Sequence, residues 1–252
     1  MLSKARRTIR HLLNYWRGLA AGKACRPTVA PGHQERSDNP LEAYFDSVAD
    51  GPGIYKWRHY FEIYHRHLSR FAGTDANLLE VGIYSGGGLA MWQKYLGRSC
   101  RIFGVDIEPA CKAYETDRVQ VFVGDQADRS FWAAVRAQVP RIDVFIDDGG
   151  HTPEQQMVTL EEMLPHLASG GVYICEDIHG RTNGFGSFVA GLQQSLNDAD
   201  FDGKHGSRTS DFQQCVGSIH LYPFVLVIEK TAIPVDRLAS ERHGTLWQPF
   251  KL

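Results

Sequence analysis

The chain has 252 residues, of which 43% are hydrophobic and 22% charged, and its formal net charge at pH 7 is −2. This length suits one large domain with a full hydrophobic core, and the near-neutral charge gives no general affinity for nucleic acid or anionic membranes. No apolar run approaches the roughly 18 residues of a transmembrane segment. The five cysteines form no C-x-x-C pair, which is typical of reduced core residues. We therefore expect a cytoplasmic protein.

The first 24 residues differ in character from the rest of the chain. They contain six basic residues, namely Lys4, Arg6, Arg7, Arg10, Arg17 and Lys23. Apolar residues at 9, 12, 13, 16 and 19 recur at helical spacing, which predicts a basic amphipathic helix. Such a helix packs on its own domain or on a second subunit, which would make a homo-oligomer, or lies on a membrane surface. We expect this helix and a linker over residues 1–50, followed by a main domain over residues 51–252.

From residue 77 the sequence alternates between strand and helix patterns. Apolar runs predict strands at residues 77–82, 100–106, 119–124, 141–147 and 171–177. Helices are predicted at residues 61–71, 88–96, 109–115, 129–138, 153–167 and 185–196. These strands suit a parallel sheet that is buried on both faces. Two further strands, at residues 216–220 and 224–230, predict an antiparallel hairpin at the edge of that sheet.

A glycine-rich turn, Glu80-Val-Gly82-Ile-Tyr84-Ser85-Gly86-Gly87-Gly88, joins the strand at residue 77 to the next helix. Glycine permits tight turns and close approach of backbone N–H groups to a ligand, and a helix N-terminus adds partial positive charge. The dinucleotide fingerprint G-x-G-x-x-G is not met, because Tyr84 replaces its second glycine. The turn alone is typical of a nucleotide-like cofactor site or of any tight turn in an α/β fold.

Polar residues follow the other strands at the carboxyl edge of the sheet, where open α/β sheets bind their ligands. Asp106 ends the second strand, about 20 residues after the glycine turn, where it can accept hydrogen bonds from ribose hydroxyls. Asp125 and Gln126 follow the third strand, where an acid or an amide can meet an adenine amino group.

Acidic pairs end the fourth and fifth strands. If these strands are neighbours, about 4.8 Å apart, Asp147 or Asp148 converges with Glu176 and Asp177. Carboxylates that share one site need a cation or raised pKa values. Oxygen ligands favour Mg²⁺ over Zn²⁺, so we expect a magnesium site. In the alternative interpretation, Asp148 caps the helix that begins near residue 153.

Two histidines, His151 and His179, lie close to these acids in the sequence. A histidine beside a metal-bound hydroxyl can act as a general base near neutral pH. Both are therefore candidate catalytic residues, although His179 could instead only hydrogen-bond a loop.

The motifs over residues 77–230, in this order, resemble those of the class I S-adenosylmethionine-dependent methyltransferases. This resemblance implies an α/β, Rossmann-like methyltransferase fold, with a seven-stranded, mostly parallel sheet, an antiparallel last strand and helices on both faces. It also implies that S-adenosylmethionine is bound by Glu80, Gly82, Tyr84, Ser85, Gly86, Asp106, Asp125, Gln126 and Asp147.

The segments 146–151, 172–177 and 218–230 resemble a narrower group, the metal-dependent sugar O-methyltransferases of macrolide biosynthesis and the cephalosporin-hydroxylase-type methyltransferases. The implied reaction is direct transfer of a methyl group to a hydroxyl of a sugar, a glycosylated small molecule or a glycan. The implied Mg²⁺ ligands are Asp147, Glu176 and Asp177, and the implied base is His151.

Outside those segments, the motif Lys56-Trp57-x-x-Tyr60 matches the same group. Residues 51–60 and 204–211 are candidates to cover the substrate. Two alternatives remain open from the sequence. One is a methyltransferase of this fold with another acceptor or no metal, and the other is a non-catalytic binding or assembly module.

Overall fold

The computed structural model describes residues 2–27, 38–139, 141–180, 182–197, 200–201, 206–241 and 243–244. The chain divides into two units, Met1–Asp38 and Asn39–Leu252. The first unit contains the predicted N-terminal helix, α1 (Leu2–Ala24), on which Leu12, Leu13, Trp16 and Leu19 are exposed. The division lies at residue 38 rather than 50, because α2 (Pro40–Ser47) buries Leu41 completely in the core of the second unit.

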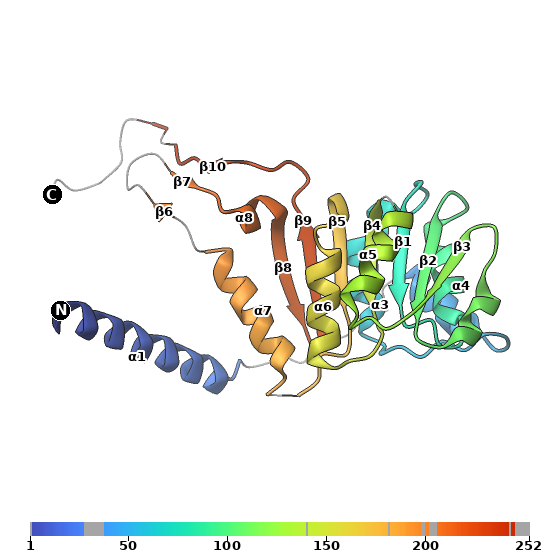
Figure 1. The fold of residues 1–252 in the computed structure, drawn as a ribbon, viewed down its shortest axis with the longest axis horizontal. Helices are drawn as coiled ribbons and strands as arrows, with labels where there is room; N and C mark the ends of the chain where they lie inside the picture. The colour runs from blue at the N-terminus through green and yellow to red at the C-terminus, as the bar shows by residue number, and fades with distance from the viewer. Residues whose placement is uncertain are drawn as a thin grey trace. The chain divides into compact units, whose positions relative to one another are not determined.

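The second unit is built on a seven-stranded sheet (Figure 1). Its strands are β1 (Asn77–Val81), β2 (Arg101–Asp106), β3 (Val119–Val123), β4 (Ile142–Asp147), β5 (Leu167–Cys175), β8 (Val216–Tyr222) and β9 (Val225–Lys230). They lie in the order β3-β2-β1-β4-β5-β9-β8. The first five strands are parallel, whereas β9 runs antiparallel to both β5 and β8. The predicted fold class is therefore confirmed, and the second strand of the hairpin lies inside the sheet.

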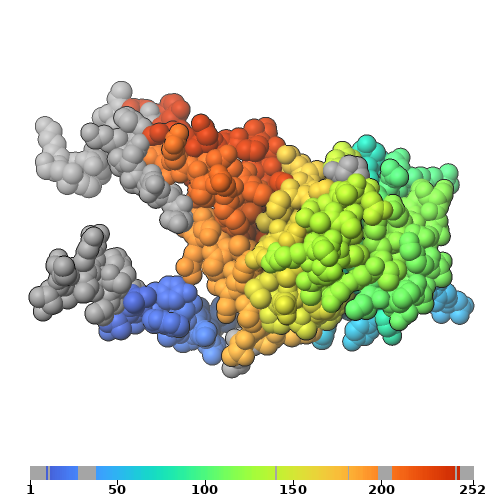
Figure 2. Space-filling view, viewed as in Figure 1, coloured from blue at the N-terminus to red at the C-terminus, as the bar shows by residue number. Residues whose placement is uncertain are grey.

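Helices cover both faces of the sheet, which gives the domain two hydrophobic cores. One face packs against α2, α3 (Tyr60–Leu68) and α4 (Gly87–Leu96), and the other against α5 (Arg129–Gln138), α6 (Pro153–Met163) and α7 (Gly184–Ser195). Successive strand residues point to opposite faces, so Leu78 packs in the first core and Leu79 in the second. Figure 2 shows side chains of α5, α6 and α7 covering the sheet on one of these faces.

Four predicted elements differ in detail from the structure. The helix expected at residues 109–115 is a 3₁₀-helix, η2 (Pro109–Tyr114), and the end of the helix expected at 61–71 is also 3₁₀, η1 (Ser69–Phe71). The helix expected to reach residue 167 ends at Met163, because Pro165 has no N–H with which to continue the hydrogen-bond ladder. β5 consequently begins at Leu167, four residues before its expected start.

The segment at residues 204–211, a candidate to cover the substrate, is only partly described. Residues 202–205 lie outside the described part, whereas β7 (Ser207–Arg208) pairs with β6 (Asp200–Phe201) and β10 (Arg237–Leu238). A capping box at Ser210 then begins α8 (Asp211–Cys215). This small sheet was not predicted, since strands of two residues leave no periodic pattern. Among the described helices, none is both long enough and apolar enough to cross a membrane.

The central strand β4 provides a test of the second core. Phe145 is fully buried, and its ring stacks on Tyr173 of β5 with centroids 4.9 Å apart. We expect Phe145→Ala to lower the free energy of unfolding by about 3–5 kcal/mol, because it leaves a cavity in the core. Chemical denaturation measures this loss. Leu221→Ala, at a side chain that is 55% exposed, serves as the control and should change stability by less than about 0.5 kcal/mol.

Candidate active site

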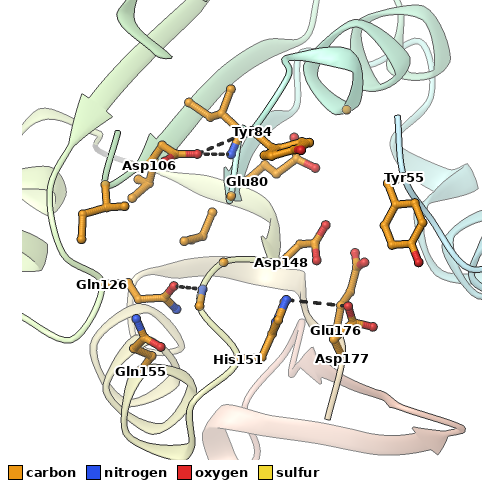
Figure 3. A pocket seen from close by; sticks show the side chains of 18 of the residues that line it. Tyr55, Glu80, Tyr84, Asp106, Gln126, Asp148, His151, Gln155, Glu176 and Asp177 are labelled. Carbon is orange, nitrogen blue, oxygen red and sulfur yellow. Dashed lines mark hydrogen bonds and ion pairs between the residues drawn. The ribbon is translucent and has the colours of Figure 1, made fainter. Parts of the chain in front are cut away.

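A pocket of about 690 Å³ opens at the carboxyl ends of β1, β2, β4 and β5. Its wall combines the glycine-rich turn, the ends of these strands, residues 53–57 of the segment before α3 and Tyr60, the first residue of α3. Figure 3 shows Asp106 beside Tyr84 toward one end of the pocket, and Asp148, His151 and Asp177 toward the other. The strand ends therefore converge as the sequence predicts.

The glycine-rich turn is held in place by Asp106. One carboxylate oxygen of Asp106 accepts hydrogen bonds from the backbone N–H groups of Ile83 and Tyr84, at 2.8 and 3.0 Å. Gly82 has a φ of +91°, and a side chain there would collide with the backbone oxygen of Asp148. Tyr84 has a φ of +49° and its side chain is 83% exposed. Asp106 thus organises the turn while it faces the pocket.

Glu80 offers an unsatisfied carboxylate oxygen to the pocket. Its side chain is buried, and Oε1 accepts a hydrogen bond from Trp92 Nε1 at 3.0 Å. Within the described part of the chain, no hydrogen-bond donor meets Oε2. Burial raises the pKa of Glu80 to about 7. A buried acceptor without a donor is costly, so this wall suits a ligand that brings a cationic donor such as an amino group.

Of the remaining residues predicted to bind the cofactor, some line the pocket and others do not. Asp125 lines the pocket, and Gln126 does so too, but the amide of Gln126 is already engaged: it accepts from Gly150 N at 2.6 Å and donates to Asp147 at 3.0 Å. Ser85 and Gly86 do not line the pocket, and Gly86 instead caps the N-terminus of α4 with a φ of +77°. Gln126 therefore braces the ends of β3 and β4 against each other.

Asp147 does not face the pocket, in contrast to the expected metal and cofactor roles. Its side chain is 2% exposed, and its two oxygens accept hydrogen bonds from Gln126 at 3.0 Å and from the Tyr173 hydroxyl at 3.2 Å. Burial raises its pKa to about 7. Asp147 is turned away from the pocket because alternate residues of a strand point to the same face of the sheet. It therefore points to the same face as Phe145, which packs in the second core. The next residue, Asp148, lines the pocket instead.

Lys56 lies among the acids, and the sequence does not predict this position because its partners are 92 and 120 positions away along the chain. Its ammonium group is 2.5 Å from Asp148 Oδ2 and 2.9 Å from Glu176 Oε2, and 4.0 Å from Glu80 Oε1. Burial by itself lowers the pKa of Lys56, but the three carboxylates more than offset this and raise its pKa above the usual value. The clustered acids thus already contain one cation. The motif that Lys56 forms with Trp57 and Tyr60 is the feature of the sequence that could have identified it as a site residue.

Glu176 lies at the centre of this arrangement. Its Oε1 accepts a hydrogen bond from the Tyr64 hydroxyl at 2.6 Å, while Oε2 accepts from Lys56. Burial and the nearby Asp148 raise the pKa of Glu176, and the Lys56 ammonium opposes that rise. Glu176 therefore faces the pocket as predicted, but both of its oxygens are engaged by side chains from the segment before α3 and from α3 itself.

Asp177 connects the acids to the predicted histidines. Its Oδ1 accepts hydrogen bonds from Trp57 Nε1 at 3.0 Å and from the Tyr60 hydroxyl at 2.6 Å. His151 Nε2 lies 3.7 Å from Asp177 Oδ2, and His179 Nε2 lies 3.6 Å from Oδ1. A φ of +54° at Asp177 turns the chain sharply here. Both histidines therefore stand beside one carboxylate, as the sequence predicts.

The residues that fit a divalent cation best are Asp148, His151 and Asp177. One ligand atom from each lies within 4.8 Å of the other two. Two carboxylate oxygens and one imidazole nitrogen suit a divalent cation. Asp148 does not cap α6, because Thr152 does so in a capping box with Gln155. Among the three predicted ligands, Asp177 belongs to this group, Glu176 is its neighbour and Asp147 lies outside.

Comparison with known proteins finds a methyltransferase domain in the chain. A family model described as a methyltransferase domain matches residues 79–178. The chain is 27% identical over 201 residues to an 8-demethyl-8-α-L-rhamnosyl tetracenomycin-C 2′-O-methyltransferase of Streptomyces olivaceus, covering 71% of this chain and 53% of the relative. It is 30% identical over 188 residues to a demethylmacrocin O-methyltransferase of Streptomyces fradiae, covering 66% and 47%. The chain thus spans about half the length of the curated relatives it matches.

The fold also matches a solved structure. MycE methyltransferase from the mycinamycin biosynthetic pathway, in complex with Mg, SAH and mycinamycin VI, superimposes with a TM-score of 0.63 at 20% identity, covering 79% of this chain and 55% of MycE. Residues 79–178 of the chain therefore match a methyltransferase domain, and the chain is similar to the macrolide sugar O-methyltransferases.

Proposed function

We propose that the protein is an S-adenosylmethionine-dependent O-methyltransferase that methylates a sugar hydroxyl of a glycosylated small molecule with the help of Mg²⁺. The observation that carries the proposal is the union of two features in one pocket. The glycine turn with Asp106 and Glu80 suits the cofactor, and the group of Asp148, His151 and Asp177 suits a metal and a proton acceptor. The names of the curated relatives support a sugar as acceptor.

The cofactor end of the pocket suits three parts of S-adenosylmethionine. The free carboxylate oxygen of Glu80 would accept a hydrogen bond from the amino group of the methionine part, which would satisfy the buried acceptor. Asp106 has acceptor capacity left for ribose hydroxyls while it holds the turn. Gly124 and Asp125 line the region that remains for the adenine. With the cofactor bound in this way, its sulfonium methyl group would face the end of the pocket that Asp148 and Asp177 line.

At the other end, Asp148 and Asp177 would hold Mg²⁺ with His151 beside them. When bound, the ion lowers the pKa of a coordinated hydroxyl and fixes its orientation. His151, at 38% exposure, can accept the hydroxyl proton and pass it to solvent, and Asp177 stabilises the imidazolium that results. Lys56 keeps Asp148 and Glu176 together by neutralising part of their charge. Alignment of the acceptor oxygen with the methyl group then supplies much of the rate.

One observation favours a second candidate, a methyltransferase of this fold that needs no metal. Lys56 already occupies the space between Asp148 and Glu176, so a cation is present without Mg²⁺. In that case the lysine itself would stabilise negative charge near the acceptor oxygen. Activity that survives EDTA would select this second candidate over the first.

The proposal as a whole is tested by methyl transfer. The purified protein is incubated with S-adenosylmethionine, MgCl₂ and either mycinamicin VI or 8-demethyl-8-α-L-rhamnosyl tetracenomycin C, the molecules in the names of two relatives. We expect S-adenosylhomocysteine to form together with a product 14 mass units heavier than the acceptor. A protein that binds the cofactor but methylates no glycosylated acceptor would argue for another substrate class. A protein that binds no cofactor would instead be a non-catalytic module.

The role of Glu80 gives a prediction for cofactor binding. We expect Glu80→Gln to raise the Kd for S-adenosylhomocysteine about tenfold or more. The glutamate carboxylate is a charged acceptor for the amino group of the cofactor, whereas the glutamine amide would present an NH₂ donor to that amino group. Isothermal titration calorimetry measures the change. Glu62→Gln, at an exposed glutamate on α3, is the matched control and should bind as the wild type does. Equal affinity for Glu80→Gln and wild type would remove Glu80 from the cofactor site.

The roles of two adjacent aspartates give a prediction for metal binding. We expect Asp148→Asn to weaken Mg²⁺ binding to the S-adenosylhomocysteine complex at least tenfold, because it removes a charged ligand. Asp147→Asn is the matched control and should leave Mg²⁺ affinity within about twofold, since Asp147 is turned away from the pocket. Calorimetric titration with MgCl₂ distinguishes the two. The reverse order of effects would restore the ligand set expected from the sequence.

A further inference from the structure

An exposed group of aromatic side chains lies beside Asp177, and we call Trp57, His179 and Phe224 the aromatic platform. The rings of Phe224 and His179 meet edge to face with centroids 4.8 Å apart, and Trp57 lies 5.6 Å from Phe224 and 6.5 Å from His179. Trp57 is 43% exposed, Phe224 40% and His179 50%. Clustered aromatic rings that stay exposed mark interaction surfaces.

The backbone of Phe224 is strained. Phe224 is the second residue of the two-residue turn between β8 and β9, and it has a φ of +66°. For a bulky L-residue this left-handed conformation costs about 1–2 kcal/mol, whereas glycine adopts it freely. Strain of this kind persists where the surroundings enforce it, and such sites are often functional. The sequence therefore retains a phenyl ring at a position where glycine would be less strained.

Hydrogen bonds to this turn fix the direction of the ring. The backbone N–H of Ile178 donates to the carbonyl oxygen of Phe224 at 3.0 Å, and His59 Nε2 donates to the carbonyl oxygen of Pro223 at 3.0 Å. Both donors belong to segments that also carry platform residues, since Ile178 precedes His179 and His59 follows Trp57 by two positions. The turn is thus tied to the other two rings from both sides.

The platform is also tied to the proposed metal and proton site. Trp57 Nε1 donates a hydrogen bond to Asp177 Oδ1, and His179 Nε2 lies 3.6 Å from the same oxygen. Trp57 lines the pocket, whereas His179 and Phe224 do not line it and are joined to it through Trp57. A ligand that lies on the rings would consequently place its edge at Asp177 and His151.

We infer that the aromatic platform is the surface on which the ring of the acceptor sugar stacks, with Phe224 as a specificity-determining residue; this inference rests on the proposed function. A pyranose has an apolar face of C–H groups, which carry partial positive charge, and an edge of hydroxyl groups. The face of an aromatic ring is negative and attracts such C–H groups. The hydroxyl edge then meets the carboxylate of Asp177, so one orientation satisfies both parts of the sugar.

Saturation-transfer NMR on the full chain tests the inference, with S-adenosylhomocysteine and MgCl₂ present and methyl α-L-rhamnopyranoside as the probe. We expect transfer to the C–H protons of one face of the sugar in wild type. Transfer should fall at least fivefold in Phe224→Gly and Phe224→Asn. Leu221→Ala, which removes an exposed side chain from the same hairpin, is the matched control and should behave as wild type.

Thermal unfolding separates recognition from packing. Because glycine and asparagine tolerate the positive φ, we expect both Phe224 variants to unfold at the wild-type temperature or above it. Weak sugar binding together with intact stability supports the platform. Wild-type sugar binding in these variants would overturn it, as would a lowered melting temperature in both, which would make Phe224 a packing residue. Absence of sugar binding by the wild-type protein would also overturn it.

Cofactor affinity distinguishes failure of this inference from failure of the proposed function. Calorimetry with S-adenosylhomocysteine should give the same Kd for wild type, Phe224→Gly and Leu221→Ala, because Phe224 does not line the cofactor pocket. If the cofactor binds and the sugar does not, the platform alone is wrong. If the wild-type protein binds the sugar on one face but not the cofactor, the platform stands and the methyltransferase does not.

Discussion

The buried ammonium of Lys56 is the interaction on which the rest of the site depends. Three carboxylates from different parts of the sheet, those of Glu80, Asp148 and Glu176, lie around it. Without a nearby positive charge, these three carboxylates would repel one another strongly, because the buried environment screens charges poorly. The same lysine connects the segment before α3 to β1, β4 and β5. That connection brings Trp57 and Tyr60 to Asp177, so the cation organises both the acids and the wall that faces them.

Much of the architecture was predictable because its causes are local. Buried parallel strands appear as short apolar runs, and glycines at forced backbone conformations mark the turn after β1. Asp106 was identified from its distance to that turn, and the structure shows the physical basis: its carboxylate binds the backbone of the turn directly. The hairpin after residue 215 was visible from two apolar runs around Pro223, although its place inside the sheet was not.

The structure differs from the predicted site at residues whose position depends on the exact end of a strand or on a contact that is distant in the sequence. Whether Asp147 or Asp148 faces the pocket depends on the exact end of β4, because neighbouring strand residues point to opposite sides. Lys56 pairs with acids 92 and 120 positions away, and no local pattern encodes such pairs. The positive φ of Phe224 is likewise invisible in the sequence, because no glycine or asparagine marks it.

The position of β9 has a consequence for how the domain is made. β9 fills the gap between β5 and β8, yet it is the last strand of the large sheet to leave the ribosome. Until residues 225–230 have emerged, the edge of β5 offers unpaired backbone groups, and β8 has no neighbour in the sheet. The glycine turn, by contrast, is hydrogen-bonded to β2, which is made early. Synthesis from the N-terminus therefore completes the end of the pocket beside Asp106 first, and the end beside Asp177, where we propose that the acceptor binds, closes last.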